Sequence, residues 1–313
     1  MTIHLVYRSC SVENRKRRPD YYNKWVTLLS FIRGAERLPD ADVVFVNDGP
    51  IPGDKLELMK DCGRVLSVNG DNLSGMRASY TYALRLPDRE NWPADDVVMF
   101  AEDDYLFTAD AFVALADAAD HLPWADYFSL YGERSDFETP EVRRRFAVPY
   151  GWHPDRGATL SGRTWFNQPS ITSTFGARVG SLREDLDIFW QCMRPFRRRF
   201  LDHETFLITQ GAIPYHGWQL VAGLPGDFEP SLRGVVRAAV LVPYRFALNR
   251  RARLQLHPHR LYAVSPNEAT HLEHPVISPD RDWRQLADEV RSWAAGTPRI
   301  ASIGDIFHGF SAA

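Results

Sequence analysis

Three consecutive acids, Glu102, Asp103 and Asp104, stand directly after an apolar run of sequence VVMFA. Such a run without alternation is typical of a strand covered by helices on both faces, and open α/β sheets bind ligands beyond the carboxyl ends of their strands. Clustered carboxylates repel one another unless a cation or hydrogen-bond donors compensate. Because these oxygen ligands select Mg²⁺ or Mn²⁺, the cluster predicts a cation site. The alternative is an acidic turn that precedes a helix near Thr108.

A second apolar run, VVFV, ends in Asn47, Asp48 and Gly49. A carboxylate at this place can accept a hydrogen bond from a base or a ribose, and glycine permits close approach of a ligand. Asn-Asp-Gly is also a common turn sequence, so the motif alone is weak. Its spacing from the acidic cluster fits alternate strands of one sheet, which predicts that Asp48 and Asp104 share one edge.

The elements that must position these acids are predicted by alternating apolar and helical stretches. Strands are predicted at residues 3–7, 43–46, 64–68, 97–101, 127–130 and 170–177. Helices are predicted at residues 21–32, 55–62, 74–86, 180–193 and 202–209. This order is typical of βα units, so we expect an α/β fold with a mostly parallel, mixed sheet flanked by helices.

The composition limits the class of protein. The chain has 313 residues, a net charge of -3 and 44% hydrophobic residues, which is ordinary for a globular protein and argues against binding of nucleic acid through overall basic charge. Its three cysteines are widely spaced without a zinc-type pairing, which favours a reducing compartment. The sequence contains no apolar run of eighteen residues, and its first residues predict a strand instead of a signal peptide. We therefore expect a cytoplasmic protein.

The last third of the chain is expected to form a helical and irregular extension, 226–313, after a main domain at 1–225. Within it, the segment 232–254 carries six arginines and no acid among apolar residues. This pattern predicts either a helix on the inner face of an anionic membrane or a helix pair, broken at Pro243, that packs on the main domain.

Two histidine pairs in the same extension have no zinc-type spacing. They are His257 with His259, and His271 with His274. Without a companion motif, we expect all four to be exposed loop residues.

The order of the motifs resembles the nucleotide-sugar half of a GT-A fold glycosyltransferase. A strand ending in Asn47-Asp48-Gly49, a helix with Gly75-Met76-Arg77-Ala78-Ser79 and a strand ending in Glu102-Asp103-Asp104 are similar to the layout of family 2 glycosyltransferases. The Glu-Asp-Asp form of the DxD element also occurs in eukaryotic N-acetylglucosaminyltransferases of that fold. The resemblance implies that Glu102 belongs to the nucleotide-sugar site, with Asp48 near the base, Arg77 near the diphosphate or base, Asp103 near the ribose and Asp104 on the metal.

The resemblance also implies an acid on the acceptor side, at the start of a helix, which deprotonates the acceptor hydroxyl. Glu204 aligns with that base in Asp202-His203-Glu204, and Asp202 is its alternative because His203 replaces the usual acid. Either carboxylate would also cap a helix. A histidine after this helix often binds the cation in such enzymes, which implies His216 as a ligand; the alternative is a partly buried, hydrogen-bonded histidine.

We therefore expect a bacterial, metal-dependent glycosyltransferase of glycan or glycoconjugate biosynthesis, with Mn²⁺ or Mg²⁺ as cofactor. The donor is expected to be a UDP-sugar, with a GDP-sugar as the alternative, and the acceptor a hydroxyl of a glycan or lipid-linked molecule; inversion is implied by the resemblance alone. Two other functions remain open at this point. One is a non-catalytic carbohydrate- or nucleotide-binding protein of the same fold. The other is a sugar-phosphate nucleotidyltransferase, although Arg8-Ser9-Cys10-Ser11 follows the first strand where a glycine-rich basic signature would stand.

Overall fold

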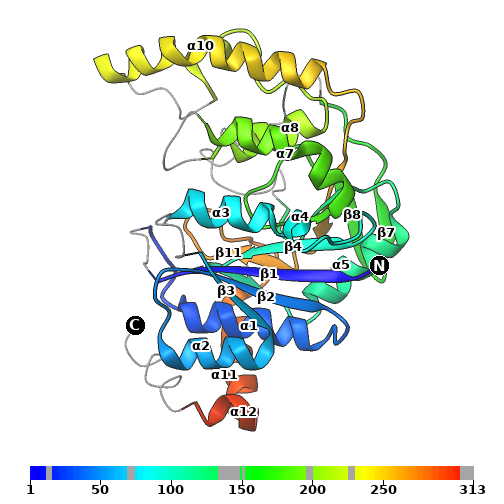
Figure 1. Cartoon of the computed structure of the whole chain (residues 1–313), viewed down its shortest axis with the longest axis vertical. Coiled ribbons are helices and arrows are strands. Elements are labelled where there is room, and N and C mark those ends of the chain that lie inside the picture. The colour runs from blue at the N-terminus through cyan, green and yellow to red at the C-terminus, as the bar shows by residue number, and fades with distance from the viewer. Residues whose placement is uncertain are drawn as a thin grey trace.

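The computed structural model describes residues 1–11, 16–68, 75–132, 149, 152–194, 200–224 and 230–303. Within these residues, nine strands form one mixed sheet in the order β3-β2-β1-β4-β9-β6-β10-β8-β7, and β11 pairs with β5 in a second, small sheet. Helices lie on both faces of the large sheet (Figure 1). The expected α/β class with a mixed sheet flanked by helices is confirmed.

The elements have the following bounds. The strands are β1 (Ile3–Cys10), β2 (Asp42–Asp48), β3 (Arg64–Ser67), β4 (Val97–Glu102), β5 (Tyr105–Phe107), β6 (Tyr127–Ser129), β7 (Ala158–Leu160), β8 (Arg163–Asn167), β9 (Phe175–Arg178), β10 (Leu261–Ser265) and β11 (Ala269–His271). The helices are α1 (Lys24–Glu36), α2 (Gly53–Cys62), α3 (Met76–Leu84), α4 (Leu86–Arg89), α5 (Ala111–His121), α7 (Val179–Met193), α8 (Asp202–Thr209), α9 (Gln219–Ala222), α10 (Leu232–Arg253), α11 (Trp283–Gly296) and α12 (Pro298–Ala301).

The four strands β3, β2, β1 and β4 form the parallel half of the sheet. In the register of β1, Cys10 lies opposite Asp48 of β2, and Arg8 lies opposite Glu102 of β4. The carboxyl ends of β2 and β4 therefore meet at one edge, on either side of β1. Each of these four strands was predicted from its apolar run, because βα units encode a parallel sheet locally.

The other half of the sheet is mixed. Strand β9 runs antiparallel to both β4 and β6, and β10 runs parallel to β6 but antiparallel to β8. Strand β10 comes from the stretch expected to be a helical extension. That stretch does contain α10, α11 and α12. It also contains β10, which belongs to the large sheet, and β11, which belongs to the small sheet.

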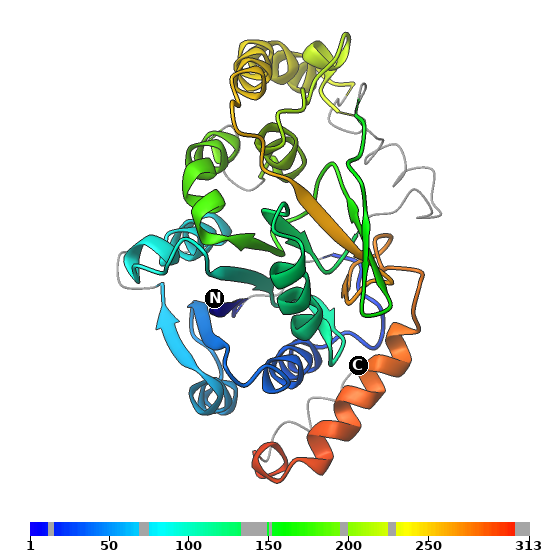
Figure 2. The same ribbon diagram turned by 90° about the vertical axis from the view of Figure 1, so that its right-hand side faces the viewer.

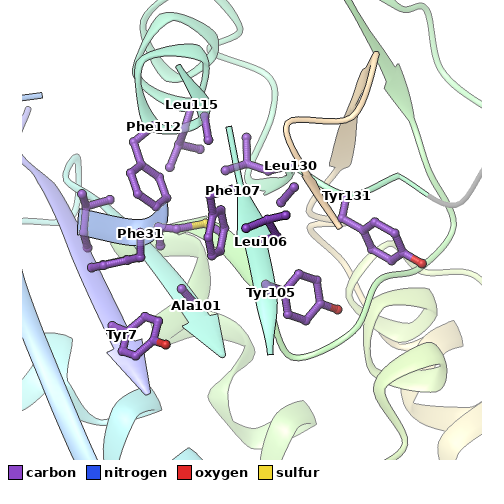
Figure 3. Packing of buried hydrophobic residues seen from close by; sticks show 14 of the residues in the cluster. Tyr7, Phe31, Ala101, Tyr105, Leu106, Phe107, Phe112, Leu115, Leu130 and Tyr131 are labelled. Atoms are coloured by element: carbon purple, nitrogen blue, oxygen red, sulfur yellow. The ribbon is translucent and has the colours of Figure 1, made fainter. Parts of the chain in front are cut away.

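Two layers of apolar side chains cover the two faces of the sheet. On one face, Phe31 of α1, Phe107 of β5 and Phe112 of α5 pack together, with ring centroids 5.2 Å apart for Phe31–Phe112 and 5.3 Å for Phe107–Phe112 (Figure 3). Trp283 and other buried residues of α11 belong to the same core as β1 and α1. The opposite face carries a second core under α3 and α7. The hydrophobic core that contains β1 therefore includes residues from both sides of the boundary expected at residue 225.

Local signals explain two differences from the predicted helices. Helix α1 begins at Lys24, three residues later than predicted, because the Asn23 side chain accepts a hydrogen bond from the Trp25 amide (2.7 Å) and caps it. Helix α10 continues through Pro243, so the predicted break is wrong. Pro243 is exposed, and the carbonyl that loses its partner therefore lies on the solvent side. Among the described helices, none is long and apolar enough to cross a membrane.

Candidate active site

The acids predicted to share one edge of the sheet do meet there. Cys10, the last residue of β1, donates its amide to Asp103 Oδ2 (2.9 Å), and the next residue, Ser11, donates its amide to the Asp48 carbonyl (3.2 Å). The end of β1 thus joins Asp48, the last residue of β2, to the acidic cluster that begins at the last residue of β4. The predicted alternative, an acidic turn that caps a helix, is wrong because the residues after the cluster form β5, and α5 begins only at Ala111.

Glu102 is paired with Arg8 on the neighbouring strand. The Arg8 guanidinium forms an ion pair with Glu102 Oε1, and Ser173 Oγ donates to Glu102 Oε2 (3.1 Å). Burial raises the pKa of the Glu102 carboxyl, and the charge of Arg8 acts against that rise. The parallel register of β1 and β4 positions this pair.

Asp103 is held by groups from β1 and α1. Lys24 Nζ and the Cys10 amide both lie 2.9 Å from Asp103 Oδ2, and Thr27 Oγ1 donates to the Asp103 carbonyl (2.9 Å). Burial raises the pKa of Asp103, Lys24 lowers it, and the neighbouring Asp104 raises it further. The first turn of α1 therefore fixes both the backbone and the side chain of Asp103.

Asp104 differs from its neighbours because one of its oxygens is buried without a described hydrogen-bond donor. Its Oδ2 accepts from Arg18 (2.9 Å) and lies 3.1 Å from His271 Nε2, whereas Oδ1 is buried and accepts no hydrogen bond within the described part of the chain. Burial by itself raises the pKa of Asp104, but His271 and Arg18 outweigh it and hold the pKa well below its usual range. Asp104 is therefore a buried carboxylate anion with an available oxygen.

His271 was not predicted as a site residue, and the expectation that it is exposed is wrong. It ends β11, where antiparallel pairing places it opposite Tyr105 of β5, and the two rings stack with centroids 4.8 Å apart. Its Nε2 also lies 3.3 Å from Glu273 Oε2. A short strand 167 residues away from Asp104 brings it here, and no spacing rule in the sequence signals that pairing.

His259 was also expected to be exposed, and this too is wrong. It is buried, with Nδ1 2.8 Å from Asp185 Oδ2, and the same carboxylate oxygen accepts from Tyr127 (2.8 Å). Burial lowers the pKa of His259, but the hydrogen bond and charge of Asp185 outweigh it and raise the pKa. This network ties the chain after α10 to α7 and β6.

Asp48 and Arg77 make separate contacts near the start of α3. Asp48 Oδ2 accepts from the Gly75 amide (2.8 Å), just before α3, where Gly75 has a φ of 106° that favours glycine. Arg77 instead donates to the Met193 carbonyl at the end of α7. Asp48 is thus attached to the acidic edge, while Arg77 joins α3 to α7.

The acidic cluster and the start of α8 share a connecting segment, residues 170–174. Ser173 donates to Glu102, as noted above, and His203 Nδ1 lies 2.6 Å from Ser170 Oγ. A second connection runs through aromatic rings: Arg8 lies over Tyr80 at 4.9 Å, and Tyr80 stacks on Phe200 with centroids 4.7 Å apart. Both connections lead from Glu102 to the residues around Asp202.

The two candidate bases of α8 differ in exposure. Glu204 is 2% exposed, and Tyr215 donates its hydroxyl to Glu204 Oε1. Asp202, the first residue of α8, is partly exposed. A base must reach a substrate hydroxyl, so the geometry favours Asp202 over Glu204.

His216 follows Tyr215 in the turn before α9. It is partly exposed, and its backbone amide donates to Gln219 Oε1 (3.0 Å). In the part of the chain that is described, no three His, Cys, Asp or Glu side chains form a metal-binding group. The assignment of His216 as a metal ligand stays a prediction.

No protein-family model matches the chain, and no curated protein matches it in sequence. Among solved structures, it is similar to the galactosyltransferase LgtC in complex with donor and acceptor sugar analogues, with 12% identity, a TM-score of 0.45, and coverage of 92% of this chain and 95% of that chain. It is also similar to glucosyl-3-phosphoglycerate synthase from Mycobacterium tuberculosis in complex with phosphoglyceric acid, with 12% identity, a TM-score of 0.41 and coverage of 80% of each chain. These structural similarities give no evidence about the site or the activity of this chain.

Proposed function

We propose that this protein is a metal-dependent glycosyltransferase that transfers a sugar from a nucleoside diphosphate sugar to an acceptor hydroxyl. The donor class rests on the resemblance of the motifs around Asp48 and Glu102-Asp103-Asp104 to GT-A enzymes. A UDP-sugar is the first donor to test and a GDP-sugar the second. The acceptor is a hydroxyl of a glycan or a lipid-linked molecule.

The observation that carries the proposal is the state of Asp104. Its carboxylate is buried and ionised beside Arg18 and His271, and its Oδ1 accepts no described hydrogen bond. A buried polar atom left without a partner is costly, and a ligand bound at this edge of the sheet would satisfy it. A divalent cation supplies such a partner, because Mg²⁺ and Mn²⁺ take carboxylate oxygens and complete their shells with water and phosphate.

The residues present fit a cation bound through few protein ligands. Asp104 would hold it through Oδ1. His271, whose Nε2 lies 3.1 Å from Asp104 Oδ2, would serve as a second ligand in its neutral form, and His216 is the alternative predicted from the sequence. When bound, Mn²⁺ or Mg²⁺ would stabilise the negative charge of the departing diphosphate. Asp103 and Glu102 would face the donor in fixed positions, because Lys24 and Arg8 hold them.

The proton of the acceptor hydroxyl would go to a carboxylate of α8. We assign this role to Asp202, since Glu204 is buried and bonded to Tyr215. The amino end of α8 stabilises a carboxylate anion through the helix dipole, so Asp202 is available as a base at neutral pH. Attack from the side opposite the leaving diphosphate would invert the anomeric carbon.

The test is a panel of UDP- and GDP-sugars, each with a mixture of hydroxyl acceptors, in Mn²⁺ and again in excess EDTA. Release of nucleoside diphosphate that depends on both acceptor and metal supports the proposal, and the anomeric proton of the product reports inversion. Thermal stabilisation by a nucleotide without release of diphosphate, across the whole panel, would instead indicate a binding protein. Release of pyrophosphate from a nucleoside triphosphate and a sugar phosphate would indicate a nucleotidyltransferase.

A further inference from the structure

Helix α10 lies along the outer edge of the molecule. Both views place it there, with α8 and α7 on its inner side (Figures 1 and 2). The helix begins at Leu232 after Ser231, whose side chain accepts from the Gly234 amide (3.1 Å), and ends at Arg253. One side of this 22-residue helix therefore faces the protein, and the other faces outward.

The inner side is fixed firmly to the protein. Leu248 and Ala252 pack in a core with residues of α7 and α8, and Asn249 exchanges two hydrogen bonds with the backbone of Tyr215 (3.1 and 2.7 Å). The buried Arg245 donates to the Val221 carbonyl (2.6 Å) at the end of α9. Within the described part of the chain, these contacts join the inner side of α10 to α7, α8 and α9.

The outer side is apolar over the first four turns. Leu232, Val235, Val236, Val240 and Phe246 are each between 51% and 84% exposed, and at 100° per residue their positions fall on one side of the helix. Scattered exposed apolar residues are ordinary on a protein surface, but a continuous row of branched and aromatic side chains marks an interaction site.

The same helix is strongly basic. It contains six arginines and no acidic residue, although the whole chain has a net charge of -3. Of these arginines, Arg245 is buried as described, while Arg233, Arg250 and Arg253 are exposed. The partner of this surface must therefore accept apolar side chains and carry negative charge.

We infer that the outer side of α10 binds the surface of an anionic phospholipid bilayer. Its Val, Leu and Phe side chains would enter the acyl boundary while the exposed arginines contact the phosphate groups. A second copy of this chain fits less well, because a two-fold interface through α10 would oppose one arginine-rich helix to another. Six arginines in 22 residues also exclude a spanning arrangement, so the helix lies on the membrane.

The position of α10 has a consequence for the rest of the molecule. Leu248 and Ala252 share their core with Ile208 of α8, the helix that begins at Asp202. A chain bound through α10 therefore carries the acceptor-side acid on a helix that packs directly against the membrane-bound one.

The first test is sedimentation of the purified full chain with vesicles. Vesicles of phosphatidylcholine with phosphatidylglycerol are compared with vesicles of phosphatidylcholine alone, at low and at high salt. We expect sedimentation with the anionic vesicles that weakens as salt rises, because exposed charges are screened. This sedimentation experiment uses the wild-type chain alone. Absence of binding to anionic vesicles at low salt would overturn the inference.

Two variants then separate the apolar and the basic contributions. Arg233→Gln/Arg250→Gln/Arg253→Gln is expected to weaken partitioning into anionic vesicles on the order of a hundredfold, from about fivefold for each arginine. Val236→Ser/Val240→Ser/Phe246→Ser is expected to abolish the binding that persists at high salt. All six positions are exposed, so the melting temperature should stay near that of the wild type.

The matched control is Val113→Ser/Arg37→Gln, which removes one apolar and one basic side chain from the exposed surfaces of α5 and the end of α1. It should bind vesicles as the wild type does. If the arginine variant and the apolar variant both bind vesicles as strongly as the control variant does, the assignment to α10 is overturned. The wild type could instead form dimers without binding vesicles, with the apolar variant monomeric. That result would overturn the assignment of a lipid partner in favour of a second copy of the chain.

Discussion

The substitution Asp104→Asn tests the candidate site most directly. It preserves the shape of the side chain but removes its charge between Arg18 and His271, whose nitrogens lie 2.9 and 3.1 Å from Oδ2. A hydrogen bond to a charged group contributes about 1.5–3 kcal/mol, and the buried site limits solvent screening. We therefore expect the free energy of unfolding to fall by about 2 kcal/mol.

This loss corresponds to a small change in melting temperature. With an unfolding entropy of about 2.1 cal/mol/K per residue, a chain of 313 residues loses about 3 °C for 2 kcal/mol. The ligand-free variant is thus folded at room temperature. A nucleotide bound to the wild type at 100 times its Kd adds about 2.7 kcal/mol, or about 4 °C, which is readily measured.

The assay is a thermal unfolding series with UDP and GDP, each in Mn²⁺ or in EDTA. We expect the nucleotide-induced rise in the wild type to require Mn²⁺ and to disappear in Asp104→Asn, together with turnover. The control is Asp88→Asn, which removes an exposed carboxylate paired with Arg183 (2.7 Å) and should change neither quantity. Metal-dependent stabilisation that survives in Asp104→Asn would refute the assignment of the cation to this residue.

Three further predictions follow from the same geometry. Asp202→Asn is expected to lower turnover about 10²–10⁴-fold with unchanged nucleotide-induced stabilisation; unchanged turnover would exclude it as the base. Glu204→Gln weakens the buried hydrogen bond to Tyr215 and should lower the melting temperature by about 2–4 °C while retaining more turnover than Asp202→Asn. His259 has a raised pKa, so the stability that its protonated form contributes is complete below the unfolded pKa of about 6.5 and is lost as pH rises through the folded pKa. The melting temperature should therefore decline over that pH range. The same decline of melting temperature with pH in His259→Asn would contradict the assignment.

The sequence was sufficient to predict the parallel half of the sheet and its acidic edge. The strands β1, β2, β3 and β4 are apolar runs separated by helical stretches, and each βα unit is complete within a short length of chain. Because the carboxyl ends of parallel strands lie at one edge of a sheet, the placement of Asp48 and the acidic cluster at the same edge was predictable, whereas the order β2-β1-β4 that brings them to either side of β1 was not. The start of helix α8 at Asp202 was predicted, because its acidic start and apolar interior are local signals.

The tertiary structure alone decided which groups surround those acids. His271 reaches Asp104 because the short strands β5 and β11 pair across 167 residues, and β10 enters the large sheet in the same way. Strands of three to five residues carry too little periodicity to specify a distant partner; packing and hydrogen-bond satisfaction select it. Burial of Glu204 and exposure of Asp202 likewise depend on Tyr215 and the elements packed around α8. The sequence therefore determined the acids, and the fold decided which of their oxygens are available to a ligand.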